Sequence, residues 1–239
     1  MITYFEKTLS TIQKSLASLD EKQFIKLLDD CYNSILRGNK VIVSGLGKNV
    51  PIGEKFVGTL NSYGINAAFL HTNTAIHGDL GIIKKGDTLI LLSKSGNTEE
   101  TIALYTYVID RQINIWGITF SKDSELIRRC KNGTANGIDD ETNIGITNEI
   151  ANKTAKGSTI ETANETVKGT VNGIALDLDS EGDKWDIVPN NSTTIYLVLL
   201  QGLAIQLADR LGVTLFDFKR NHPGGSIGRT LGVMERKIG

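Results

Sequence analysis

The stretch GDTLILLSKSGNTEE, residues 86–100, contains the change of pattern that decides the fold. Residues 89–92 are apolar without interruption, which is typical of a strand buried on both faces of a sheet. Hydroxyl side chains around a glycine follow, and the two glutamates after them are typical of the first turn of a helix. The stretch therefore predicts a buried strand, a short polar loop and a helix in direct succession.

The same succession recurs along the chain. Short apolar or β-branched runs indicate five strands, at residues 40–45, 66–71, 86–93, 113–120 and 174–178. Apolar residues at helical spacing indicate helices, namely two amphipathic ones within residues 1–36 and others at 53–64, 97–112 and 193–212. Apolar strands separated by helices indicate a parallel sheet covered on both faces. We therefore expect a doubly wound α/β fold with a five-stranded parallel sheet, and residues 1–239 in one domain.

Residues 134–173 break this pattern. The segment has no aromatic residue and no leucine, and it is rich in Thr, Asn and Gly. It therefore lacks the apolar area that a core of its own would need. We interpret it as an insertion before the fifth strand that enters at the amino-terminal edge of the sheet, where it would leave the ligand-binding edge open.

Composition excludes several classes of partner. The formal net charge is −1, so there is no electrostatic reason to expect nucleic acid or an acidic membrane surface. The first residues show no secretory signal, and no later window is apolar for the length of a membrane span. We expect a cytoplasmic protein. Cys31 and Cys130 lie far apart in helical segments, which favours ordinary thiols over a disulfide or a metal site.

The loop after the third strand has the composition of a phosphate site. Ser93, Ser95 and Thr98 offer hydroxyl donors, and Gly96 allows the backbone to approach a ligand closely. The loop precedes a helix, whose first amides and partial positive charge attract anions. The alternative is a plain helix cap at Thr98, but three hydroxyls and a glycine exceed what a cap requires.

A second loop, SGLGKNVPIG, follows the first strand and carries Gly45, Gly47 and Lys48. Lys48 could place a cation beside the same anion. The loop matches neither the GxxxxGK[ST] nor the GxGxxG motif. A lone lysine near glycines is usually solvated, so this loop alone indicates little.

The chain contains three histidines, His71, His77 and His222, and all three fall in loop segments that we expect at ligand sites. A histidine in such a loop can carry protons at neutral pH. A solvated or locally hydrogen-bonded histidine is commoner for any one of them.

The order of these motifs resembles a known family. SGLGKN (44–49), FLHTNTAIHGDLG (69–81), LLSKSGNTEE (91–100), NNSTT (190–194) and NHPGGSIGR (221–229) together resemble the sugar isomerase (SIS) superfamily, and within it the arabinose-5-phosphate isomerases. The resemblance implies a flavodoxin-like three-layer fold. It also implies interconversion of D-ribulose 5-phosphate and D-arabinose 5-phosphate through a cis-enediol, which supplies Kdo synthesis for lipopolysaccharide or capsule.

The resemblance also implies roles for single residues. The residues that match the family's catalytic positions are Lys48, His77, Glu100, Glu181 and His222. The residues that match substrate-binding positions are Gly47, His71, Ser93, Ser95, Thr98, Ser192 and Thr193. His71 further matches a histidine associated with inhibitory zinc. The family implies a homotetramer with sites near subunit interfaces, in which a site can be shared between subunits.

The proposed reaction explains why such residue types are needed. Isomerisation moves a proton between neighbouring carbons and needs no redox cofactor, so none is expected. A carboxylate partly shielded from water can have its pKa raised toward neutral pH so that it acts as the base, while lysine or histidine stabilises or protonates the enediolate oxygens. Glu181 and Glu100 both remain candidates for the proton shuttle.

The sequence departs from the family in two places. Asn49 and Val50 follow the lysine where the isomerases usually have Ser-Gly, and residues 134–173 are additional. The tandem CBS pair common in the family does not follow residue 239, so we expect a single SIS domain without that regulation. The alternatives are another SIS phosphosugar isomerase, such as a 6-phospho-3-hexulose isomerase, a non-catalytic phosphosugar sensor, and a scaffold that displays the additional segment.

Overall fold

A computed structural model describes residues 2–132, 169–226 and 228–229. Its strands are β1 (Val41–Gly45), β2 (Ala67–His71), β3 (Thr88–Leu92), β4 (Asn114–Thr119) and β5 (Val171–Ala175). Its α-helices are α1 (Ile2–Ala17), α2 (Glu21–Leu36), α3 (Asn49–Ser62), α4 (Glu99–Val108), α5 (Glu125–Asn132), α6 (Asn191–Arg210) and α7 (Leu215–Arg220). Two 3₁₀ turns, η1 (Ala75–His77) and η2 (Asp79–Ile82), follow β2.

The strands form one five-stranded sheet in the order β2-β1-β3-β4-β5, and every neighbouring pair is parallel. This order confirms the doubly wound, flavodoxin-like arrangement that the sequence predicts. The assignment of residues 1–239 to one domain stays a prediction.

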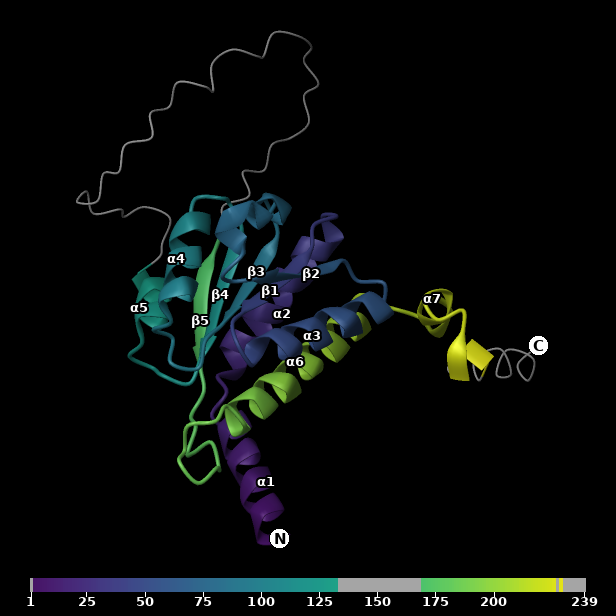
Figure 1. The fold of residues 1–239 in the computed structure, drawn as a ribbon. Coiled ribbons are helices and arrows are strands. Elements are labelled where there is room, and N and C mark those ends of the chain that lie inside the picture. The colour runs from purple at the N-terminus through teal and green to yellow at the C-terminus, as the bar shows by residue number, and fades with distance from the viewer. Residues whose placement is uncertain (1, 133–168, 227, 230–239) are drawn as a thin grey trace, which may run out of the picture.

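Alternation along the strands divides the core into two layers. Val41 and Val43 pack on one face of the sheet with α2, α3 and α6. Ile42, between them, packs on the other face with α4 and α5. A strand with apolar residues at every position can cover both faces because successive side chains point to opposite sides. Figure 1 shows the sheet between these two groups of helices.

One buried carboxylate, that of Asp87, fixes the starts of the neighbouring strands β1 and β3. Asp87 is fully buried and accepts hydrogen bonds from the backbone nitrogens of Lys40 (3.0 Å) and Lys84 (2.7 Å). It also pairs with the Lys40 ammonium at 2.7 Å. A buried carboxylate needs such partners. The contact therefore holds β1 and β3 in register, and with them the loops at their opposite ends.

The fifth strand begins earlier than the sequence indicates. We predicted a strand at 174–178, but β5 is Val171–Ala175 and pairs with β4 from Ile115↔Val171 onward. Residues 171–173 therefore belong to the sheet and not to the additional segment. The pattern is obscured because β5 is a partly exposed edge strand, and Gly173 lies against Ile127 of α5 where a side chain would clash.

Residues 134–168 of the additional segment lie outside the described residues. The backbone nitrogen of Ile115, at the start of β4, donates to the carbonyl oxygen of Thr170 at 2.7 Å. The described chain thus joins β5 at the amino-terminal edge of the sheet, and the placement of the additional segment stays a prediction.

The two cysteines lie in α2 and α5 and are both buried and free. Burial raises the pKa of the Cys130 thiol to about 11, which makes it unreactive at neutral pH. None of the described helices combines the length and the apolar character needed to cross a bilayer.

Candidate functional site

The first feature of the site is a cavity of about 330 Å³ between the loops that follow β1 and β3. The chain leaves β1 toward β2 on one side, while β3 lies on the other. The connections diverge at this point, which is where ligands bind in open parallel sheets. The lining residues are Leu46, Gly47, Lys48, Asn49, Leu92, Ser93, Lys94, Ser95, Thr98, Thr101 and Pro189. Five of the predicted site residues are thus brought together: Gly47, Lys48, Ser93, Ser95 and Thr98.

Contacts within the β3–α4 loop leave the first turn of α4 available. The Ser93 hydroxyl accepts a hydrogen bond from the Gly96 backbone nitrogen at 3.0 Å and lies 2.9 Å from the Thr98 hydroxyl. Thr98 occupies the cap position of α4 but its side chain makes no capping bond. The alternative of a plain threonine cap is therefore wrong for this geometry. The first amides of α4 keep no side-chain acceptor.

The loop after β1 differs, because the first amides of α3 are used: the backbone nitrogens of Asn49 and Val50 donate to the carbonyls of Leu46 (3.1 Å) and Gly47 (3.2 Å), and Pro51 has no N–H. Gly47 adopts a φ of +58°, and Lys48 precedes α3 without a side-chain capping bond. Asn49, one of the departures from the family pattern, donates from Nδ2 to the Leu92 carbonyl at 3.2 Å. Asn49 thus ties the two loops together. The uncapped first turn of α4 and the start of α3 meet at the cavity, where their partial positive charges favour an anion.

The amino end of α6 is occupied by an anion of the chain itself. Glu181 is 1% exposed. Its Oε2 accepts the backbone nitrogens of Asn190 and Ser192, each at 2.9 Å. Its Oε1 accepts the Ser192 hydroxyl at 2.6 Å and pairs with the Lys94 ammonium at 2.7 Å. The carboxylate therefore caps α6 and leaves neither oxygen free.

These contacts decide the protonation state of Glu181. Burial raises the pKa of its carboxyl, but the Lys94 ammonium, the Ser192 hydroxyl and the two backbone amides together outweigh burial and hold the pKa below its ordinary value. Glu181 is therefore ionised at neutral pH. A base tuned upward toward neutrality, as one of our sequence hypotheses required, is not the state that this environment favours.

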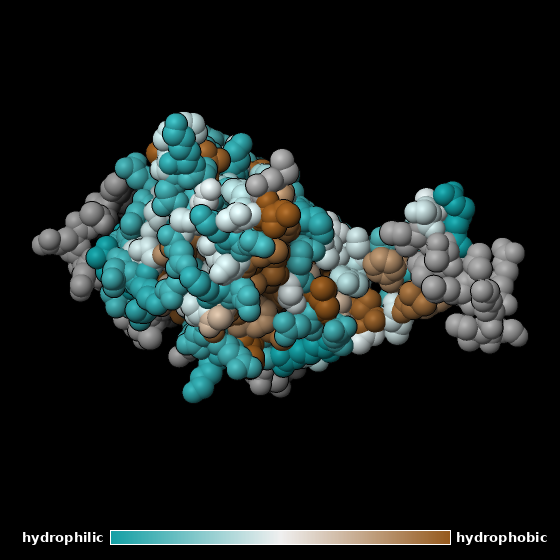
Figure 2. Space-filling model, turned by 90° about the horizontal axis from the view of Figure 1, so that it is seen from below, coloured by the Kyte–Doolittle hydropathy of each residue, from teal (hydrophilic) through white to brown (hydrophobic). Residues whose placement is uncertain are grey.

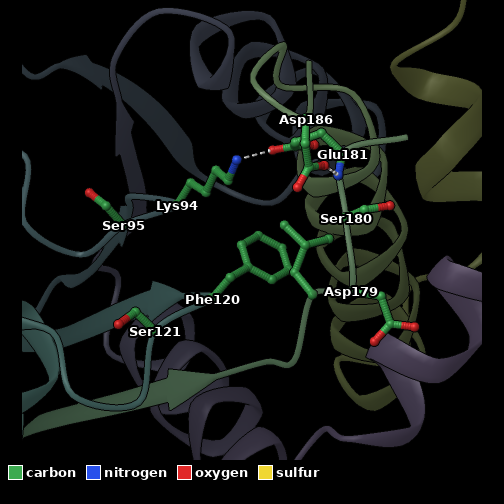
Figure 3. A pocket seen from close by; sticks show the side chains of 9 residues that line it. Lys94, Ser95, Phe120, Ser121, Asp179, Ser180, Glu181 and Asp186 are labelled. Atoms are coloured by element: carbon green, nitrogen blue, oxygen red, sulfur yellow. Dashed lines mark hydrogen bonds and ion pairs between the residues drawn. The ribbon is translucent and has the colours of Figure 1, made fainter. Parts of the chain in front are cut away.

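A second cavity of about 430 Å³ adjoins the first (Figure 3). It is lined by Lys94, Ser95, Phe120, Ser121, Leu178, Asp179, Ser180, Glu181 and Asp186. Lys94 and Ser95 line both cavities. Sequence analysis missed Lys94 although it lies inside the hydroxyl loop, because only the neighbouring serines were weighed. A cation at the carboxyl end of a strand, next to a helix start, was the available indication.

The remaining predicted residues line neither cavity. His71 ends β2, where Gly45 of β1 is its sheet partner, and its Nδ1 is buried without a hydrogen-bond partner. His77 lies in η1 and Glu100 in the first turn of α4, and both are exposed. Thr193 donates to the Pro189 carbonyl at 3.1 Å, so its hydroxyl, like that of Ser192, is used within the helix start.

The zinc expectation finds little support in the side chains around His71. Among the described residues, no group of three His, Cys, Asp or Glu side chains could hold a metal ion. His71 therefore lacks companion metal ligands within the described part of one copy of the chain.

His222 lies at the other end of the molecule. Phe218 of α7 packs against Tyr63 with ring centroids 5.8 Å apart, and Asn221 donates to the Ser62 carbonyl at 3.3 Å. Ser62 ends α3, whose first residue borders the cavity. Since a 14-residue helix is about 20 Å long, His222 and Lys48 of one chain are separated by roughly that length. The expected grouping of His222 with the other site residues does not occur within one chain.

Comparisons with known proteins agree with this architecture. The SIS domain family matches residues 34–163. The chain is 31% identical to the arabinose 5-phosphate isomerase KpsF of Escherichia coli over 97% of its own length and 59% of that protein. It is 30% identical to the arabinose 5-phosphate isomerase KdsD of Francisella tularensis over 95% of its length and 57% of that protein. It thus spans less than two thirds of either relative.

A solved structure has the same fold. The protein c3406 of Escherichia coli CFT073, in complex with arabinose 5-phosphate, superposes with a TM-score of 0.70 at 24% identity, over 92% of this chain and 94% of that one.

Replacing Gly96 by Ala should damage the β3–α4 loop. Gly96 has a φ of +64°, and an added Cβ would lie 2.3 Å from the Ser124 hydroxyl oxygen. We expect a loss of about 2 kcal/mol in the free energy of unfolding and the loss of stabilisation by inorganic phosphate. Thermal unfolding with and without phosphate measures both. The control is Gly58→Ala in α3, where nothing lies within 4 Å of the new Cβ. A G96A protein that melts and responds to phosphate as the wild type does would contradict this account of the loop.

Acid should weaken the cap of α6. Because the folded pKa of Glu181 is lowered, its stabilisation is complete above its unfolded-state pKa of about 4.3 and is lost as the pH falls through the lower folded value. Urea unfolding should show E181Q less stable than the wild type by on the order of 1–2 kcal/mol near neutral pH, and the difference should shrink below about pH 4. The exposed Asp123→Asn serves as control. A pH-independent difference would argue against an ionised Glu181.

Proposed function

Because the chain belongs to the SIS domain family, we propose that it is a phosphosugar isomerase that interconverts D-ribulose 5-phosphate and D-arabinose 5-phosphate. The observation that carries the proposal is one cavity at which the uncapped first turn of α4 meets the start of α3, with Lys48 and three hydroxyls at its rim. Two relatives named as arabinose 5-phosphate isomerases, matched over nearly all of this chain, support the choice of substrate.

The phosphate group occupies the first cavity. The amides at the start of α4 and the hydroxyls of Ser95 and Thr98 donate to its oxygens, and Lys48 supplies a positive charge on the opposite rim. A dianion gains from both helix ends at once. The sugar then extends from this fixed point toward the carboxyl ends of the neighbouring strands.

The chemistry is an internal transfer of hydrogen. A proton leaves C1 of ribulose 5-phosphate and one is returned to C2, while the hydroxyl proton of O1 is lost and O2 gains one. C1 is oxidised as C2 is reduced, so the reaction needs no external oxidant or reductant. The intermediate is a cis-enediolate, whose negative charge must be stabilised by nearby cations or donors.

The environments of the two candidate carboxylates favour Glu100 as the proton shuttle. Both oxygens of Glu181 are already occupied by donors, whereas Glu100 is exposed at the start of α4. A base must be within hydrogen-bond reach of the substrate proton, and a carboxylate held by four donors is poorly placed to turn toward it. In this proposal His77 and His222 assist ring opening and hydroxyl proton transfer.

His222 reaches this site from a second copy of the chain. In one copy it lies beyond the far end of α3, just after the projecting α7 (Figure 1). An exposed apolar face supports such an assembly: Ile2, Phe5 and Leu9 share one side of α1, and Val198 and Ile205 lie two turns apart on α6. Figure 2 shows an apolar band across this face that continues toward the projecting end. A homotetramer would cover these residues.

Other partners follow from the same proposal. The substrate is a phosphorylated pentose, and neither nucleic acid nor a membrane is expected to take part. Cytoplasmic location stays a prediction from the sequence.

Proton exchange during turnover tests the reaction. In heavy water without added metal, ribulose 5-phosphate should give arabinose 5-phosphate that carries deuterium at C2, because the enediolate is reprotonated from solvent. ¹H and ¹³C NMR follow both product and label. The E100Q variant should lose at least about 100-fold in kcat with its fold intact. Binding of the sugar phosphate without any conversion by the wild type would replace this proposal by the phosphosugar sensor.

Subunit mixing tests whether His222 acts from another copy. E100Q and H222N chains, each inactive, are unfolded together and refolded in equal amounts. If each site takes Glu100 and His222 from different chains, about one quarter of the sites regain both residues and activity returns. Mixing E100Q with K48M is the control, since both positions belong to one chain's site and no recovery is expected. Equal failure of both mixtures would place His222 outside the site.

A further inference from the structure

Lys94, which lines both cavities, forms an ion pair with Glu181, which lines the second; Figure 3 marks the pair with a dashed line. The backbone of Lys94 is fixed by the end of β4. Its carbonyl oxygen accepts hydrogen bonds from the Phe120 backbone nitrogen (3.0 Å) and the Thr119 hydroxyl (2.9 Å). Its side chain leaves this fixed point at the end of β3 and reaches the loop before α6. The pair therefore joins the β3–α4 loop to the start of α6.

The two partners differ in access to a ligand. Glu181 is 1% exposed and is held by α6 through Asn190 and Ser192. The Lys94 side chain is 39% exposed and lines both cavities. A lysine ammonium has three donors and Glu181 uses one of them. Lys94 can therefore bind an oxygen of a ligand without leaving Glu181.

Charge in the second cavity decides which end of a substrate lies there. Besides Glu181, its walls carry Asp179 and Asp186, and Lys94 is the cation among the described residues that line it. Glu181 is paired with Lys94, and Asp179 with the exposed Lys14 (3.1 Å). Asp186 therefore leaves the cavity with a net negative charge that disfavours a phosphate dianion. These carboxylates suit the hydroxyls of an open-chain sugar, which donate hydrogen bonds. With the phosphate in the first cavity, the C1–C2 end of the sugar passes over Lys94.

We propose that Lys94 is a further substrate-binding residue, which donates to the oxygens of C1 and C2, and that Glu181 is the positioning residue that holds Lys94 there. The inference rests on the isomerase proposal, and it deepens it by assigning the cation that meets the enediolate. Glu181 thereby takes a different role from the proton shuttle considered from the sequence.

The role follows from where charge develops. In the enediolate, negative charge appears on O1 and O2 at the end of the sugar that carries no phosphate. An ammonium fixed in advance by a buried carboxylate stabilises this charge without reorganising at the moment of reaction. It contributes less to the substrate itself, whose carbonyl is neutral. Loss of Lys94 should therefore act on kcat more than on KM.

A double-mutant cycle separates positioning from proton transfer. K94M should lower kcat by about 100-fold and change KM by less than about threefold. E181Q should lower kcat by at least about 10-fold in the wild type but by less than about threefold in the K94M background, because it then has nothing left to position. If E181Q abolishes turnover equally in both backgrounds, Glu181 is the base and the proposal is overturned.

Two further variants serve as controls for the double-mutant cycle, one that keeps a cation at position 94 and one that removes a different lysine. K94R should restore part of kcat, since a guanidinium can still pair with Glu181. K122M removes the nearby exposed pair of Lys122 with Asp177 and should leave kcat and KM unchanged. Circular dichroism and thermal unfolding establish that each variant is folded. A K94M protein with the kinetics of K122M would also overturn the proposal.

Equilibrium binding tests Lys94 independently of turnover. The hydroxamate of 5-phospho-D-arabinonic acid imitates the enediolate and does not react. By calorimetry, K94M should weaken its binding about 100-fold and leave inorganic phosphate binding unchanged. If the wild type binds the hydroxamate but isomerises no sugar, the proposed function fails while this binding assignment stands. If K94M binds the hydroxamate as the wild type does, the assignment fails.

Discussion

The parallel direction of all five strands is the constraint on which the rest of this structure depends. It places the carboxyl end of every strand, and the amino end of the helix that follows, at one edge of the sheet. The order β2-β1-β3-β4-β5 then separates the loops after β1 and β3 and opens a cavity between them. Asp87, buried at the opposite edge, keeps these two strands in register.

The helices that begin at this edge differ in whether a side chain caps their amino ends. The first turns of α3 and α4 receive no side-chain cap and face the cavity, whereas α6 carries the buried carboxylate of Glu181. The chain thus fills the anion position at α6 itself and leaves the first amides of α4 without a side-chain acceptor. Lys94 connects an uncapped helix start with the capped one, because its backbone belongs to the β3–α4 loop and its ammonium pairs with Glu181 at the start of α6. The same ion pair that closes α6 therefore fixes a cation at the rim of the site.

A single chain presents an incomplete arrangement. The apolar side of α1 is exposed, and the α7 segment contacts the end of α3 through Phe218 and Asn221. Both features suit packing between copies, which would also bring a second chain's His222 toward the sheet edge where Lys48 and Ser95 lie. In this account assembly and catalysis depend on the same projecting helix.

The sequence by itself determined the layers, the strand direction and the loops that form the candidate site. Fully apolar strands such as 89–92 are stable when covered on both faces, and glycine with hydroxyls before a helix is a local pattern. The sequence misplaced β5, because an edge strand with Asn172 and Gly173 has no apolar pattern to detect. Only the tertiary structure shows that donors occupy both carboxylate oxygens of Glu181 and that Lys94 is one of these donors. It also places His222 about one helix length away from Lys48. These are contacts between residues far apart in the chain, and their geometry depends on how helices pack across the sheet, which no local pattern records.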